Sequence, residues 1–168
     1  MATIGATTGA EAPSVLMAQR LALAVPALMI AAAYVAEYAF GLYPCEMCWW
    51  QRYAHFAALL LALAALFLPR ARAALLALSA LAITAGAIIA GFHAGVEYGW
   101  WEGFTSCSST VDFAAGGNAL DAVMNAPLVR CDQAPWSLAG ISLAGWNALI
   151  SMLTGLALFR LLGLRERP

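Results

Sequence analysis

Four long apolar runs, separated by short polar segments, set the pattern of the chain. They cover approximately residues 21–42, 49–68, 73–96 and 136–162, and each reaches the length of about 20 residues with which an α-helix crosses a bilayer. We therefore predict an all-α membrane protein, a bundle of four transmembrane helices formed by a single domain over residues 1–168. The first run is longer than the apolar part of a signal peptide, about 7–15 residues, and only Arg20 flanks it, so we expect it to be retained as a span.

The composition agrees with a membrane location. Hydrophobic residues make up 64% of the chain and charged residues 10%, whereas an average soluble domain contains about 25% charged residues. All eight basic residues are arginine, and no basic patch indicates a nucleic-acid partner.

The placement of the arginines predicts the orientation, because positive residues beside membrane spans stay in the cytoplasm. Only Arg52 and Arg130 fall at one end of the predicted bundle. The others fall at the opposite end: Arg20, Arg70, Arg72, Arg160, Arg165 and Arg167. We therefore expect both termini in the cytoplasm and residues 43–48 and 97–135 outside, which in a bacterium describes an inner-membrane protein with two periplasmic loops.

All four cysteines fall on the predicted outer side: Cys45, Cys48, Cys107 and Cys131. An even number of cysteines in an oxidising compartment predicts disulfides. A c-type haem site would need histidine after Cys48, where Trp49 stands, and a four-cysteine zinc site would need two close pairs, so we predict no metal. Two structural disulfides in a non-catalytic four-span protein remain an alternative.

The first cysteine pair has a setting that a structural disulfide does not require. We expect Cys48 to begin the second helix, where unpaired backbone N–H groups and the helix dipole stabilise a thiolate. At 100° per residue, Cys48, Arg52 and His55 lie within about 60° of one another on the helix surface. One helix face therefore carries a thiol, a guanidinium and an imidazole at the membrane edge.

Several motifs together resemble the disulfide bond formation protein B family, DsbB. They are "PCEMCWWQR" at the start of the second run, "FHAGVE" at the outer end of the third, the loop with Cys107 and Cys131, and "WSLAGISLAGWN" at the start of the fourth. The resemblance covers about residues 15–162. Vitamin K epoxide reductase-like proteins use similar chemistry, but their loop pair precedes the membrane-edge C-x-x-C, and here the C-x-x-C comes first.

The resemblance implies a relay of electrons. A periplasmic thioredoxin-like partner, similar to DsbA, would reduce a loop disulfide between Cys107 and Cys131, and thiol–disulfide exchange would pass the electrons to Cys45–Cys48. Cys48 would then reduce a quinone in the membrane, either ubiquinone or menaquinone. The same four cysteines are thus the expected catalytic residues of a protein-dithiol:quinone oxidoreductase.

The expected quinone-binding residues differ in how closely they follow the family. Arg52 matches the family arginine that supports quinone reduction, and His93 matches the histidine of a segment near the quinone. Glu97 occupies a position where some members have glutamine. His55 lies outside the family motif, and it either lines the quinone pocket or packs in the interior.

Two further expectations concern the surroundings of this site. Glu37 is a costly acid within the first span, and Arg52 is its expected partner. Residues 118–124 of the second loop carry Leu120, Val123 and Met124 on one side, which predicts a short amphipathic helix on the membrane surface.

Overall fold

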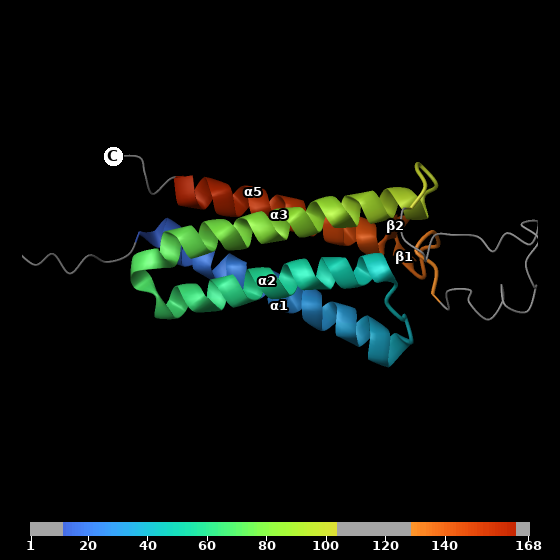
Figure 1. Cartoon of the computed structure of the whole chain (residues 1–168), viewed down its shortest axis with the longest axis horizontal. Helices are drawn as coiled ribbons and strands as arrows, with labels where there is room; N and C mark the ends of the chain where they lie inside the picture. Colours follow the sequence, from blue (N-terminus) through green and yellow to red (C-terminus); the bar gives the residue numbers. More distant parts are fainter. Residues whose placement is uncertain (1–11, 104–128, 164–168) are drawn as a thin grey trace, which may run out of the picture.

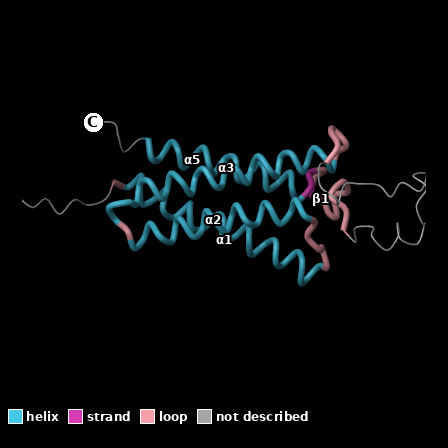
Figure 2. The backbone as a smooth tube through the Cα atoms, viewed as in Figure 1, coloured by secondary structure: helices cyan, strands magenta, loops and turns pink. Residues whose placement is uncertain are grey.

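A computed structural model describes residues 12–103 and 129–163 of the chain. Its four long helices are α1 (Pro13–Phe40), α2 (Glu46–Phe67), α3 (Arg72–Glu97) and α5 (Leu143–Gly163). A 3-10 turn, η1 (Pro69–Ala71), joins α2 to α3, and the strands β1 (Ser137–Leu138) and β2 (Ile141–Ser142) precede α5. Figures 1 and 2 show how these elements are arranged. All four helices are long and apolar enough to cross a membrane. The prediction of an all-α, multi-pass membrane bundle is confirmed.

The start of the last helix differs from the prediction. The apolar run begins near residue 136, but α5 begins at Leu143 because residues 137–142 form an antiparallel hairpin in which Ser137 pairs with Ser142. Its two turn residues, Ala139 and Gly140, have φ angles of 52° and 78°. Positive φ at both turn positions is typical of a tight hairpin and incompatible with a helix. The predicted surface helix at residues 118–124 lies outside the described residues.

The first helix also begins earlier than expected. α1 begins at Pro13 instead of residue 21, and the fixed φ of proline suits the first turn of a helix. The apolar run in the sequence begins only after the polar residues Gln19 and Arg20, so hydropathy did not predict this earlier start. Gln19 is nevertheless buried and donates from Nε2 to the carbonyl of Ala62, at 2.8 Å.

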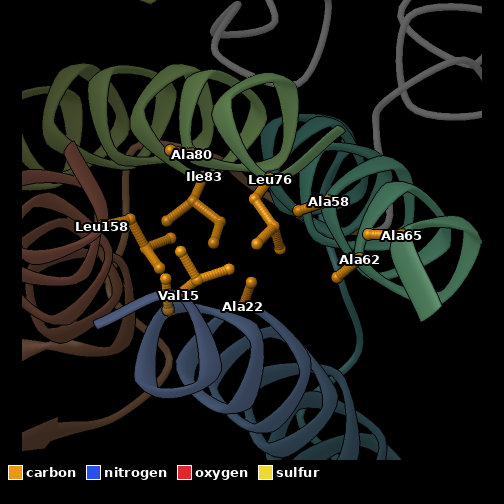
Figure 3. Packing of buried hydrophobic residues seen from close by; sticks show 10 residues of the cluster. Val15, Ala22, Ala58, Ala62, Ala65, Leu76, Ala80, Ile83 and Leu158 are labelled. Carbon is orange, nitrogen blue, oxygen red and sulfur yellow. The ribbon is translucent and has the colours of Figure 1, made fainter. Parts of the chain in front are cut away.

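Small side chains form the packed interior at the end of the bundle where α1 begins. Ala18, Ala22, Ala58, Ala62, Ala65 and Ala80 are fully buried beside Leu76, Ile83 and Leu158 (Figure 3). Further along α3 from the η1 turn, a Cβ atom added at Gly86 would lie 3.1 Å from the Cβ of Ala54, so α2 and α3 approach closely there. Short side chains allow such contacts, on which helix association in membranes depends.

The two ends of the bundle differ in character. The start of α1, the η1 turn and the end of α5 lie at one end (Figure 1). The ends of α1 and α3, the start of α2 and the hairpin lie at the other. α1 contains Pro26, which removes a backbone hydrogen bond, and its C-terminal half runs at an angle away from α2 (Figure 1). The candidate site lies at this second end.

Candidate active site

The first cysteine pair occupies the first turn of α2. Cys45 is the N-cap residue, and its Sγ accepts a hydrogen bond from the backbone N–H of Cys48 at 3.3 Å. The Cys45 thiol donates to Sγ of Cys48, with the sulfur atoms 3.0 Å apart. The expectation that Cys48 begins the helix is wrong by two residues, because capping by Cys45 starts α2 at Glu46. Cys48 still lies in the first turn, where backbone N–H groups favour an anion.

Cys45 is the protonated partner of this pair. The hydrogen bond to Cys48 is the main cause that raises the pKa of Cys45 to about 12, and burial adds to it, whereas His93 acts in the opposite direction. Only 4% of the Cys45 surface is exposed. In the reduced state Cys45 therefore remains a thiol at neutral pH, and its proton must leave when a disulfide forms.

His93 links the cysteine pair to the second loop and to α3. Its Nε2 lies 3.6 Å from Sγ of Cys45, 3.2 Å from the carbonyl oxygen of Cys131 and 3.7 Å from Oε1 of Glu97. The side chains of His93 and Glu97 are both only 2% exposed. The structure thus places a histidine with a nearby carboxylate directly beside the Cys45 thiol.

Cys131 lies next to the first cysteine pair. It is fully buried in a cluster with Cys45, Met47 and Val96, and Cys48 packs against the same cluster. Its predicted partner Cys107 lies outside the described residues, so the loop disulfide remains a prediction. Cys131 and Cys45 therefore lie in one buried cluster at this end of the bundle.

The neighbours of Cys131 carry opposite charges that face each other. The guanidinium of Arg130 donates to both carboxylate oxygens of Asp132, and this contact holds the pKa of the Asp132 carboxyl below its ordinary value. The two charges therefore largely offset each other beside Cys131.

Arg52 is buried at the centre of the site, one helical turn below Cys48. Its Nη1 donates to Oε2 of Glu37 at 2.6 Å, which confirms the predicted pairing, and Nη2 donates to the carbonyl of Ala33 at 3.2 Å. The rings of Tyr34 and Trp49 lie on the guanidinium, with centroids 4.9 and 4.8 Å from Cζ. These contacts fix the position of the guanidinium, so Arg52 does not extend toward headgroups as an interfacial anchor would.

A buried chain of polar side chains connects the two histidines across three helices. Gln51 Nε2 lies 2.9 Å from Nδ1 of His93, and Asn147 Nδ2 donates to Oε1 of Gln51 at 2.7 Å. His55 Nε2 lies 2.9 Å from Oδ1 of Asn147, and Ser151 donates to the same oxygen at 2.9 Å. Sequence reasoning did not single out Gln51 or Asn147. Their polarity within membrane spans is the signal that could have found them.

One pocket collects the predicted quinone-binding residues. Its volume is about 160 Å³, and apolar residues of α1 such as Met29, Ile30 and Ala33 form part of its wall. Its polar lining contains the residues that the sequence predicted together with those it missed: Cys48, Gln51, Arg52, His55, His93, Glu97 and Asn147. The face of α2 that was predicted to carry Cys48, Arg52 and His55 therefore does point into one cavity.

The same sulfur and nitrogen atoms form a potential metal-ligand set. The ligand atoms of Cys45, Cys48 and His93 all lie within 4.8 Å of one another. Two thiolates and an imidazole suit a thiophilic ion such as Zn²⁺, a combination that the sequence analysis did not consider. Because formation of the Cys45–Cys48 disulfide would consume two of the three ligands, this set exists only in the reduced protein.

A C-x-x-C pair, with a histidine beside it and a pocket below it in a four-helix membrane bundle, defines a membrane protein built for thiol redox chemistry. Comparison with known proteins gives the family. A sequence profile described as "Disulfide bond formation protein DsbB" matches residues 17–161, and the chain belongs to the DsbB family of disulfide bond formation proteins.

Several relatives share this family name. The chain is 36% identical over 165 residues to the disulfide bond formation protein B of Verminephrobacter eiseniae, with 88% of each chain covered. It is 30% identical over 152 residues to that of Marinobacter nauticus, with 84% of this chain and 89% of the relative covered. An uncharacterized protein of Rickettsia prowazekii is 25% identical over 133 residues, covering 77% of each chain. No solved structure matches the chain significantly.

Proposed function

We propose that this protein is a thiol:quinone oxidoreductase. It reoxidises a periplasmic, DsbA-like thiol oxidase and passes the electrons to ubiquinone or menaquinone. The observation that carries the proposal is that Cys48, Arg52 and both histidines line one pocket within the membrane bundle.

The pocket has the size and character that a quinone ring needs. An apolar protein cavity of about 150 Å³ accepts a benzene ring, and this pocket has a volume of about 160 Å³. Apolar side chains of α1 would hold the ring, and the polar groups that α2, α3 and α5 contribute to the lining would supply hydrogen bonds to its oxygens. Mostly apolar walls with a few convergent polar groups are typical of cofactor sites.

Cys48 and Cys45 have different parts in the reaction. Cys48 lines the pocket and delivers electrons to the quinone, while Cys45 bonds to Cys48 as the disulfide forms. The two thiols lose two electrons and two protons, and the quinone takes up the same number to become a quinol. Arg52, held by Glu37, stabilises the negative charge that develops on the quinone oxygen. His93, with its Nε2 3.6 Å from Sγ of Cys45, stabilises the thiolate that forms when this thiol loses its proton.

The second cysteine pair connects this site to the soluble partner. A reduced partner attacks the Cys107–Cys131 disulfide, and exchange with Cys45–Cys48 regenerates it. The packing of Cys131 against Cys45 supports this transfer. The arginines at the opposite end of the bundle support an inner-membrane location with both termini in the cytoplasm.

A steady-state assay distinguishes this function from that of a non-catalytic protein with structural disulfides. Purified protein is mixed with a reduced periplasmic thioredoxin-like protein and a soluble quinone analogue, and quinone reduction is followed by absorbance. We expect multiple turnovers for the wild type and none for Cys45→Ser. Absence of turnover with the wild type, or equal thiol oxidation by Cys45→Ser, would refute the enzyme.

A further inference from the structure

The buried polar chain between the histidines has a defined direction of hydrogen bonding. Gln51 Nε2 donates to the backbone carbonyl of Met47 at 3.2 Å, and a carbonyl only accepts, so the orientation of the Gln51 amide is fixed. Its Oε1 must then accept from Asn147 Nδ2, as observed at 2.7 Å. Consequently, Asn147 Oδ1 is the acceptor that faces His55 and Ser151.

This direction assigns the tautomer of each histidine. His55 Nε2 faces the carbonyl oxygen of Asn147, so it carries the ring proton. In the neutral ring the other nitrogen, Nδ1, then has a lone pair and no proton. At the opposite end of the chain, Gln51 Nε2 donates to Nδ1 of His93, which leaves the proton of His93 on Nε2, beside Cys45.

The lone pair of His55 Nδ1 is unused within the described part of the chain. Only 3% of His55 is exposed, and Nδ1 is a buried atom with no hydrogen-bond partner there. A buried polar atom left unpaired destabilises the folded protein. His55 is also one of the residues that line the pocket, which makes a ligand bound there a candidate for the missing donor.

The dimensions fit a para-quinol lying along α2. Its two oxygens are roughly 5 Å apart, from two C–O bonds across a six-membered ring, and a hydrogen bond of about 2.8 Å at each end gives roughly 11 Å. Cys48 and His55 are seven residues apart, which corresponds to about 10.5 Å along a helix axis. One oxygen near Cys48 and Arg52 therefore places the other near His55.

We infer that His55 Nδ1 accepts a hydrogen bond from the distal hydroxyl of the quinol, so that the pocket binds quinol more tightly than quinone. The inference rests on the proposed function and adds to it a preference for one redox form. A quinol hydroxyl donates to the lone pair of Nδ1, whereas a quinone carbonyl presents a second lone pair and cannot. Tighter binding of the reduced product favours electron transfer out of the dithiol.

The size of the preference follows from one buried hydrogen bond. At about 1 kcal/mol, His55 should improve quinol binding relative to quinone binding about fivefold. For a two-electron couple this ratio raises the midpoint potential of the bound quinone by about 20 mV.

The test compares dissociation constants for a short-chain ubiquinone analogue in its oxidised and reduced forms. A Cys45→Ser background prevents turnover. His55→Phe keeps a ring but removes the acceptor, while Asn147 Oδ1 retains the hydrogen bond from Ser151, and we expect the quinol preference to fall about fivefold. Thr154→Val is the control. It removes a buried hydroxyl that donates at 2.7 Å to the carbonyl of Ile150, outside the polar chain, and should leave the preference unchanged.

A ligand-side arm keeps the test independent of the folding of any variant. The dimethyl ether of the quinol donates no hydrogen bond, so His55 should bind it no better than it binds the quinone. If the wild type reduces quinone but its quinol preference survives both His55→Phe and methylation, this inference is overturned while the proposed function stands. If the wild type fails to reduce quinone at all, the proposed function fails first.

Discussion

The buried Arg52–Glu37 pair allows the structural and catalytic parts of one arginine to be separated. The two side chains are 6% and 12% exposed and meet at 2.6 Å. Removing one member of a buried pair typically costs about 3–5 kcal/mol, because it leaves an uncompensated charge, whereas replacing both members with apolar residues is often neutral. Arg52→Met should therefore destabilise the protein by about 3 kcal/mol or more.

The second member of the pair should be less costly to replace. Without Glu37, the guanidinium keeps the Ala33 carbonyl and the rings of Tyr34 and Trp49, so Glu37→Leu should cost about 2 kcal/mol. The double variant should cost less than the sum of the two single variants by at least about 2 kcal/mol. Unfolding in detergent micelles, measured as a double-mutant cycle, gives these free energies.

The rate of quinone reduction in these variants should not parallel their free energy of unfolding. Loss of the charge at position 52 removes about 1–3 kcal/mol of stabilisation from the developing anion, so Arg52→Met should lower kcat/KM for quinone roughly 5–150-fold. The double variant should remain equally impaired although its stability recovers. Reaction of either variant with the reduced thiol partner should change little. Additive stabilities, or recovery of quinone turnover in the double variant, would refute this reasoning.

Other predictions concern the cysteines and the packing of α3. Cys131→Ser should accumulate a mixed disulfide between Cys107 and the nucleophilic cysteine of the partner, because the thiol that carries electrons onward is gone. Cys107→Ser should not, and non-reducing gels with a partner that retains only its nucleophilic cysteine would show the reverse if the assignment is wrong. Because the pKa of Cys45 is about 12, its alkylation in the reduced protein should stay slow until the pH approaches 12. Cys48→Ala removes the main cause of that shift, so mass spectrometry should detect alkylation at lower pH, and an unchanged profile would contradict this. Gly95→Ala would place a methyl group where the indole of Trp101 packs, and should lower the free energy of unfolding by about 1–3 kcal/mol. Thermal unfolding that is the same as in the wild type would contradict this contact.

The sequence predicts the helices well wherever the lipid environment determines them. The four spans follow from the length of the predominantly apolar runs, because a helix in hydrocarbon satisfies its own backbone hydrogen bonds. The hairpin before α5 escaped notice because its strand residues Leu138 and Ile141 are as apolar as a helix would be. Hydropathy measures solubility in lipid and carries no information on backbone angles, so it could not reveal the two positive φ angles at the turn.

Part of the site was predictable for the same local reason. Helix periodicity places Cys48, Arg52 and His55 on one face, and the cost of a buried carboxylate points to a partner for Glu37. The hydrogen bonds of Gln51 and Asn147 were not predictable, because they depend on how α2 and α5 are rotated and displaced relative to each other. The relative placement of two helices depends on packing between distant segments of the chain. Periodicity within one segment does not reveal it.

A single-turnover measurement tests the central claim, that the Cys45–Cys48 dithiol itself reduces quinone. In a Cys107→Ser/Cys131→Ser background the first pair is the only cysteine pair, and the reduced, partner-free protein is mixed with excess quinone analogue. The account predicts one quinol formed per protein, together with loss of two titratable thiols, and no quinol after a further Cys48→Ser change. Quinol formation that survives Cys48→Ser, or a fully reduced dithiol that yields no quinol, would contradict it.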